Sequence, residues 1–371
     1  MPESISFDKA ALAWTLPWDA DWVTAVCFLG ATRRLAAGNN LGQILLWDLP
    51  EKAGGSPPIP IRRLEGHTNV VTRLLATADG RGLISASFDH SIRYWDTQVS
   101  ATGSATVVLN ARKIAEASSP GGKRSGKKVP PPMEAKVQTQ AADRVLDGHR
   151  EWVRGLSLSG DGKLLLSGDD AGQVILWDRA AAKELRRWKV KGWSYALALA
   201  PDGKQAAVSE RVPLVFDSGR HCGIRLWDAT TGQPQRELDK EFTKIYLAAA
   251  AYSPDGKVLA LGRGGEADGN NGKVFLIDPA TGKKIRELTP GHQYGITDLA
   301  FHPDGKHLAS SGRDTIIRIW DVASGKMVKE LGKARGGQFK DWIHAISFSA
   351  DGRWLAGADM AGSIQVWTFP A

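Results

Sequence analysis

The chain has 371 residues, of which 42% are hydrophobic and 24% charged, a composition typical of soluble globular proteins that excludes wholesale disorder. Such a length often divides into two or three domains, but an all-β barrel or propeller can reach it as one unit. No apolar stretch reaches the roughly 18 residues of a membrane span, and no secretory signal opens the sequence. The two cysteines, Cys27 and Cys222, make no disulfide framework, so we expect a cytoplasmic protein that does not contact a membrane.

The net charge of +8 raises nucleic acid as a partner, but the charge is concentrated in one segment. Residues 97–141 hold seven Lys and Arg against two Asp and Glu, and the rest of the chain is close to neutral.

Strand-like segments recur along the chain, beginning with residues 9–16. Later segments end at a recurring dipeptide: Trp47-Asp48, Trp95-Asp96, Trp177-Asp178, Trp227-Asp228, Ile277-Asp278, Trp320-Asp321 and Trp367-Thr368. Most intervals are 43 to 50 residues, and one is 82. Self-similarity at this period is typical of a propeller or another repeat array.

Each interval predicts four short strands separated by three turns. Asp-Gly pairs at 79–80, 161–162, 202–203, 255–256, 304–305 and 351–352 supply the positive φ of a tight hairpin turn. A second turn falls near Asp89, and a third follows the terminal dipeptide. Four strands per repeat make one propeller blade.

The phrase GHTNVVTRLLATADGRGLISASFDHSIRYWD at residues 66–96 recurs at 148–178 and 291–321, with Gly-His, Asp-Gly and Trp-Asp in the same order. In these motifs the chain resembles the WD-repeat β-propeller family over roughly 320 residues. The resemblance implies one all-β domain over residues 1–371, a closed seven-bladed propeller. The last repeat is one strand short, so we expect residues 9–16 to complete it and to remove an open sheet edge.

The resemblance also implies a buried hydrogen-bonded tetrad of His, Ser or Thr, Asp and Trp in each intact blade. We expect a complete tetrad of His67, Ser87, Asp89 and Trp95 in the second blade. In the sixth we expect His292, Asp314 and Trp320, with Gly312 in place of the serine. In the third, Ala171 would replace the aspartate and Asp169 the serine.

The long interval predicts a basic, disordered insertion at residues 97–141, in the third turn of the second blade, because its centre is rich in Pro, Gly, Ser and Lys. It is either a solvated loop or a basic arm for RNA, DNA or an acidic protein. Longer second turns at 209–223 and 263–272 should raise a wall on the face that carries the Gly-His loops, where binding residues concentrate.

No catalytic constellation, cofactor motif or metal site is indicated. Asp217, His221 and Cys222 form a weak signal for a metal or thiol site, and the oxygen-bearing residues at 266–271 lack the order of a calcium loop. We expect no catalytic residues and no bound metal.

Aromatic residues recur at one position, just before the innermost strand of each blade. The position reads Trp22, Val70, Trp152, Trp193, Tyr246, Gly295 and Trp342 across blades one to seven. Three are preceded by an acidic residue: Asp21, Glu151 and Asp341. These residues should ring the mouth of the central channel, and exposed aromatic clusters are typical interface hot spots.

The sequence therefore favours a non-catalytic scaffold that binds a protein or peptide on this aromatic rim. Two alternatives stay open: a propeller hydrolase with a metal in the channel, and a nucleic-acid-associated factor that uses the basic segment. The hydrolase would need converging Glu, Asp, Asn or His where this chain places tryptophans.

Overall fold

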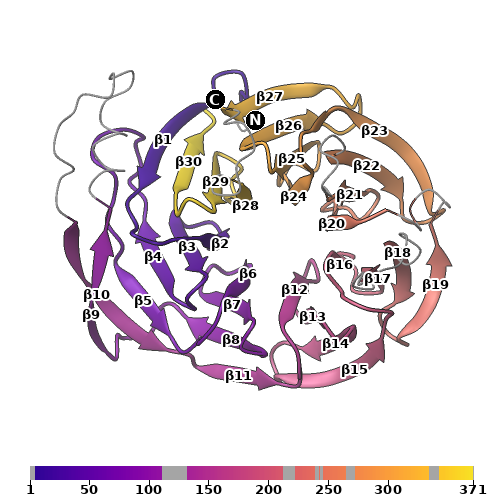
Figure 1. Ribbon diagram of the computed structural model, residues 1–371, viewed down its shortest axis with the longest axis horizontal. Coiled ribbons are helices and arrows are strands. Elements are labelled where there is room, and N and C mark those ends of the chain that lie inside the picture. The colour runs from indigo at the N-terminus through magenta and orange to yellow at the C-terminus, as the bar shows by residue number, and fades with distance from the viewer. Residues whose placement is uncertain are drawn as a thin grey trace.

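The computed structural model describes residues 5–110, 132–211, 222–238, 242, 245–264, 272–333 and 342–370. All thirty regular elements of these residues are β-strands, and they form seven sheets arranged in a ring (Figure 1). The prediction of an all-β, seven-bladed propeller is confirmed. The described residues include no helix that could cross a membrane.

Each blade runs from an innermost to an outermost strand. The first blade contains β2 (Val23–Phe28), β3 (Arg34–Asn39), β4 (Ile44–Asp48) and β5 (Arg62–Glu65). The second contains β6 (Val71–Ala76), β7 (Gly82–Ser87), β8 (Ser91–Asp96) and β11 (Arg144–Asp147). The third contains β12 (Val153–Leu158), β13 (Leu164–Asp169), β14 (Gln173–Asp178) and β15 (Lys183–Lys189).

The remaining four blades repeat this order. The fourth contains β16 (Leu197–Leu199), β17 (Gln205–Arg211), β18 (Cys222–Asp228) and β19 (Gln233–Glu237). The fifth contains β20 (Leu247–Tyr252), β21 (Leu259–Arg263), β22 (Gly272–Asp278) and β23 (Lys283–His292). The sixth contains β24 (Ile296–Phe301), β25 (His307–Gly312), β26 (Ile316–Asp321) and β27 (Met327–Gly332). The seventh contains β28 (Ile343–Phe348), β29 (Trp354–Asp359), β30 (Ile364–Thr368) and β1 (Ala11–Leu16).

The N-terminal strand lies in the same sheet as the C-terminal strand. β1 pairs antiparallel with β30, with Leu12 opposite Trp367 and Leu16 opposite Ile364. Trp14 stacks on Trp354 with ring centroids 5.4 Å apart. Both termini of the chain consequently lie at the same place in the ring (Figure 1).

The hydrophobic core is divided among the junctions between blades. The buried apolar side chains form seven clusters, and each combines strands of two neighbouring blades. Hydrogen bonds between innermost strands reinforce these junctions: Thr24 donates to the Val71 carbonyl at 2.6 Å, and Thr72 donates to the Val153 carbonyl at 2.7 Å. A rigid ring is the expected result, because each blade packs on both of its neighbours.

The Asp-Gly turns have the predicted geometry. The six glycines adopt φ between 67° and 72°, which is the left-handed region that the turn requires. In four of these turns a Thr or Ser hydroxyl two residues before the aspartate donates to its carboxylate, as Ser159 does to Asp161 at 2.7 Å.

The tetrads of the third and sixth blades are complete, whereas in the second blade the buried Trp95 indole N–H has no hydrogen-bond partner. The serine that we assigned to the tetrads is wrong. His67 accepts a hydrogen bond from Ser85 at 2.5 Å and donates one to Asp89 at 2.7 Å. Ser87 instead donates to the Asn69 carbonyl at 3.0 Å. Ser85 and Ser87 share one face of β7 because side chains alternate along a strand, so the sequence period could not distinguish them.

The same shift of two residues corrects the other two tetrads. In the sixth blade Ser310 bonds His292 at 2.8 Å, so the expected loss of the serine is wrong. The glycine there has its own reason, since a Cβ on Gly312 would lie 2.4 Å from the His292 ring. In the third blade Ser167 bonds His149 at 2.7 Å, and Asp169 supplies the carboxylate at 2.8 Å rather than replacing the serine.

Part of the predicted insertion is ordered, which contradicts a disordered segment over all of residues 97–141. β9 (Gly103–Leu109) and β10 (Met133–Ala141) form an antiparallel hairpin. β10 also pairs in parallel with β5, so a segment inserted in the second blade extends the sheet of the first (Figure 1). The stretch 111–131, which holds six of the seven basic residues, lies outside the described residues.

Apolar residues on alternate positions of the hairpin explain this order. Val107, Leu109, Ala135 and Val137 are all at most 7% exposed and join the core cluster that contains Trp14 and Trp18. The Pro, Gly and Lys content of the segment as a whole concealed this short β-pattern.

Candidate functional site: the aromatic rim of the channel

The rim residues precede the innermost strands, so the closed ring places them around one mouth of the central channel. Trp22 and Trp152 are the most exposed, at 46% and 42%, and Trp193 and Trp342 are partly buried. Tyr246 differs, because it is only 8% exposed and packs edge-on against Tyr195. Four of the five predicted aromatic residues therefore reach the surface, whereas Tyr246 is buried.

An aromatic cluster, which we define as Phe88, Trp152, Trp193 and Tyr195, joins the second, third and fourth blades. Phe88 stacks on Trp152 with ring centroids 4.4 Å apart and planes at 13°. Phe88 comes from the turn between β7 and β8, whereas Trp152 precedes β12. Stacking across a blade junction fixes the orientation of the exposed Trp152 ring before any partner arrives.

Arg154 lies at the centre of this cluster. Its guanidinium carbon is 4.7 Å from the Phe88 centroid, 4.9 Å from that of Tyr195, 5.5 Å from that of Trp193 and 5.6 Å from that of Trp152. It also donates a bidentate pair of hydrogen bonds to Asp170, one of them at 2.8 Å. These contacts lie within the range of cation–π interactions, and the paired carboxylate holds the cation in place.

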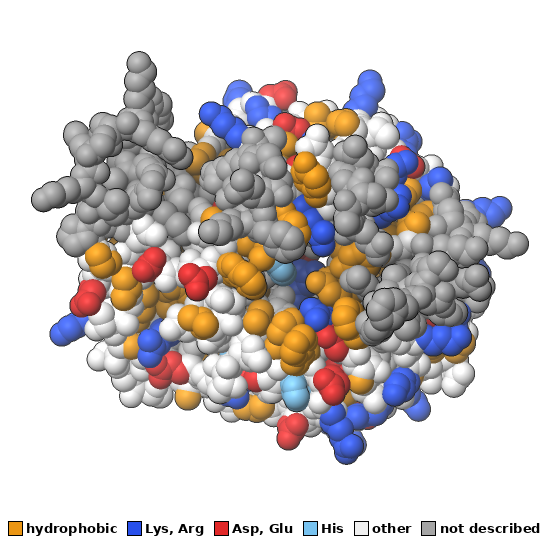
Figure 2. Space-filling view, in the orientation of Figure 1, with side chains coloured by type: hydrophobic (Ala, Val, Ile, Leu, Met, Phe, Trp, Pro, Cys, Tyr) orange, Lys and Arg blue, Asp and Glu red, His pale blue; other side chains and the backbone are white. Residues whose placement is uncertain are grey.

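A second aromatic–cation contact lies across the mouth. The guanidinium of Arg313 is 4.2 Å from the Trp342 ring centroid. Figure 2 shows hydrophobic side chains gathered around the central hollow of the face in view, with basic side chains between them. This combination of aromatic and Arg side chains is the composition enriched at binding hot spots.

The acidic neighbours are only partly described. Asp21 and Glu151 are exposed beside Trp22 and Trp152. Asp341, and most of the predicted wall loops at 209–223 and 263–272, lie outside the described residues.

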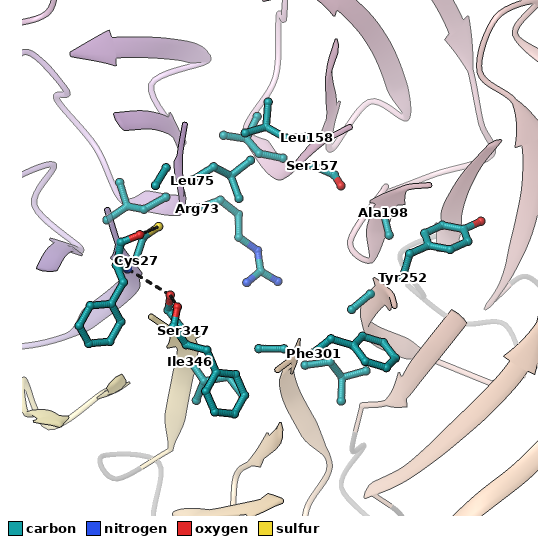
Figure 3. A pocket seen from close by; sticks show the side chains of 18 of the residues that line it. Cys27, Arg73, Leu75, Ser157, Leu158, Ala198, Tyr252, Phe301, Ile346 and Ser347 are labelled. Carbon is teal, nitrogen blue, oxygen red and sulfur yellow. Dashed lines mark hydrogen bonds between the residues drawn. The ribbon is translucent and has the colours of Figure 1, made fainter. Parts of the chain in front are cut away.

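An ion pair crosses the channel. Arg73 of the second blade donates to Asp298 of the sixth at 2.9 Å, and the second carboxylate oxygen of Asp298 accepts the Ile346 amide at 3.0 Å. Around this pair the innermost strands enclose a cavity of about 750 Å³. Figure 3 shows the Arg73 guanidinium projecting into the open channel between Ser347 and Ser157.

Cys27 lines this cavity but is a poor nucleophile. Burial raises the pKa of its thiol to about 12, so the thiolate that would attack a substrate is scarce at neutral pH. Burial likewise lowers the pKa of His344, which contacts the Thr24 carbonyl at 3.1 Å.

Comparison with known protein families shows which kind of repeat the blades contain. The family model for the WD domain, G-beta repeat, matches residues 58–96, 142–178, 282–321 and 329–368. Each match covers one repeat of the seven-bladed ring. The chain is a WD-repeat β-propeller.

Three curated relatives illustrate the range of WD-repeat propellers that the chain resembles. The small ribosomal subunit protein RACK1y of Oryza sativa subsp. japonica is 25% identical over 82% of this chain and 94% of its own length. The guanine nucleotide-binding protein subunit beta of Solanum tuberosum is 24% identical over 86% of both chains. The human WD repeat and SOCS box-containing protein 1 is 30% identical over 39% of this chain and 32% of its own length.

Sequence reasoning missed two members of the aromatic cluster of this WD-repeat propeller, Phe88 and Tyr195, and also Arg154 at its centre. The signal for Arg154 and Tyr195 was available, because both stand two residues after a predicted rim position. Phe88 could not be found in this way, since it reaches Trp152 from another blade.

Proposed function

We propose that this WD-repeat propeller is a non-catalytic scaffold whose aromatic rim binds a protein or peptide partner. The observation that carries the proposal is the exposed Trp152 ring, held by Phe88 and Arg154 at the mouth of a rigid channel. Two relatives are a small ribosomal subunit protein and a guanine nucleotide-binding protein subunit beta, and both names denote members of multi-chain assemblies, which supports the proposal. We also propose a cytoplasmic location.

The residues of the channel favour a scaffold rather than a hydrolase. Both of its charged groups are engaged with one another, since Asp298 binds Arg73 and the Ile346 amide. A hydrolytic metal centre needs several free carboxylates or imidazoles that converge on one point.

The test is a double substitution of the rim, Trp152→Ala with Trp342→Ala. Cross-linking of the full chain in cells and mass spectrometry identify a partner, and that partner is then titrated against both proteins. We expect binding to weaken by at least about 2 kcal/mol, the usual threshold of a hot spot. Thermal melts should change little, because truncation at a channel mouth leaves no enclosed cavity.

Leu185→Ala provides the matched control, because Leu185 is 46% exposed on the outer strand β15. Its binding should equal that of the unmodified protein. A rim variant that melts and binds normally would remove the rim as the functional surface.

A further inference from the structure

The Asp-Gly turn of the sixth blade departs from those of the second, third, fifth and seventh blades. In the third, fifth and seventh blades Ser159, Ser253 and Ser349 donate a hydroxyl to the aspartate two residues later. In the sixth blade this position is His302, and its Nδ1 lies 3.0 Å from Oδ1 of Asp304. An imidazole nitrogen thus takes the place of a hydroxyl donor.

The surroundings of His302 set the position of its proton. Nε2 lies 3.1 Å from the Gly352 carbonyl oxygen, which can only accept, so Nε2 is the protonated nitrogen. Nδ1 then carries a lone pair, which accepts a hydrogen bond from the Asp304 amide at 3.2 Å. The same nitrogen faces an oxygen of the Asp304 carboxylate. Two acceptors at this separation repel one another unless a proton on Nδ1 or a metal cation lies between them.

A second imidazole completes the cluster. His307 Nδ1 lies 2.7 Å from Oδ2 of Asp304, and one ligand atom from each of the three residues lies within 4.8 Å of the others. Two imidazole nitrogens and a carboxylate oxygen are the donor set of three-ligand zinc sites. Among the described residues this is the one such group of three.

The contact between His302 and the Gly352 carbonyl is of the kind that commonly accompanies a metal-binding histidine. A histidine that binds a metal commonly donates its other ring N–H to a backbone carbonyl, which fixes the tautomer. The approach is close, since a Cβ on Gly352 would lie 2.1 Å from Nε2. The three side chains of the cluster differ in their exposure to solvent: His302 is 4% exposed, His307 21% and Asp304 32%. Solvent therefore reaches the cluster on the side of His307 and Asp304.

We propose that His302, Asp304 and His307 form a binding site for one divalent transition-metal ion, with zinc as the fitting ion and water as its fourth ligand. Tetrahedral zinc with bonds of about 2.0 Å separates its ligand atoms by about 3.3 Å, so side chains whose ligand atoms now lie within 4.8 Å of one another would close around the ion. Imidazole ligands favour zinc over magnesium or calcium.

The ion would join three parts of the ring. Phe7 packs on both imidazoles, with ring centroids 5.4 Å from His302 and 4.5 Å from His307. Gly352 belongs to the turn of the seventh blade, and Phe7 to the segment that leads into β1. Metal binding would thus hold the sixth blade against the place where the chain's two ends meet.

Isothermal titration of the metal-free, untagged full chain with ZnCl₂ tests the proposal. We expect one ion per chain, and a thermal midpoint that rises with zinc concentration because the ion binds only the folded state. His302→Ser and His307→Gln install the residues that Ser349 and Gln205 supply at the matching positions of other blades. Each should weaken binding at least tenfold.

His90→Asn is the control for adventitious binding, since His90 is an exposed histidine of another turn with φ of 70°, which asparagine tolerates. It should bind zinc as the unmodified chain does. Absence of stoichiometric zinc binding, or binding that neither substitution weakens, would overturn the site. His307→Gln keeps the test decisive if the buried His302 variant fails to fold.

Discussion

At the scale of single residues, three buried histidines connect the second turns of the second, third and sixth blades to the adjoining strands. His292 donates to Asp314 at 2.8 Å and accepts from Ser310, which in turn accepts the Trp320 indole N–H at 2.9 Å. Every side chain of this sixth-blade network has a hydrogen-bond partner, and such a buried network is costly to interrupt.

Ser310→Ala is expected to lower the free energy of unfolding by about 1–3 kcal/mol, because it strands the His292 nitrogen and the Trp320 indole in the core. Ser324→Ala, an exposed hydroxyl in the same blade, should stay within about 0.5 kcal/mol of the unmodified protein. Denaturant titration compares the two. Equal effects would mean that the network contributes nothing specific.

Acid should destabilise the propeller through the same histidines. Burial lowers the pKa of both His67 and His292 below 6.5, so the unfolded chain binds protons more readily than the folded one. The contribution of these two histidines to the free energy of unfolding is therefore complete above about pH 6.5. It is lost as the pH falls toward their folded-state pKa values. Thermal melts from pH 8 to 5 should show a falling midpoint, and a flat profile would contradict this assignment.

At the scale of elements, two segments lie outside the regular repeat yet contribute to its core. The hairpin β9–β10 extends the first blade, and β1 supplies the outer strand of the seventh. Both place alternate side chains in the same cluster, where Trp14 is 2% and Leu109 1% exposed.

The hairpin should be necessary for full stability. Leu109→Ala removes a buried side chain and should cost about 2–5 kcal/mol, whereas Val108→Ala, 40% exposed on the same strand, should cost less than about 0.5 kcal/mol. Denaturant titration measures both. Deletion of residues 100–140 should likewise destabilise the ring, because it removes both strands of the hairpin. An unchanged melt would show that the hairpin packing is dispensable.

Deletion of residues 1–16 tests whether β1 closes the ring. The truncated protein would lack the partner of β30 and would expose an unpaired sheet edge, which favours association between chains. We expect a lower thermal midpoint and oligomers in size-exclusion chromatography. A truncated chain that stays monomeric and melts like the full one would disprove closure by this strand.

At the scale of the whole molecule, the ring is held both at its junctions and across its channel. Asp298 links three blades, because it pairs with Arg73 of the second and accepts the Ile346 amide of the seventh. Residues 225 positions apart in sequence are thereby joined through the centre.

Asp298→Ala should lower the free energy of unfolding by about 1–3 kcal/mol, since it leaves both donors without their acceptor. Asp298→Asn keeps one acceptor oxygen and should retain more of the stability. The measurement is denaturant titration of the two variants together with Arg73→Met. If Asp298→Ala and Arg73→Met are both neutral, the pair across the channel has no structural role.

The sequence by itself determined the architecture, because the period of Trp-Asp and Asp-Gly elements specifies the blades and the turns independently of their neighbours. It also located Trp22, Trp152, Trp193 and Trp342, whose place follows from one repeated position. Only the tertiary structure decided which serine meets His67, since residues two apart share a strand face. It alone brought Phe88 to Trp152, and His307 to His302, because contacts between blades and across a turn depend on packing that no single repeat encodes.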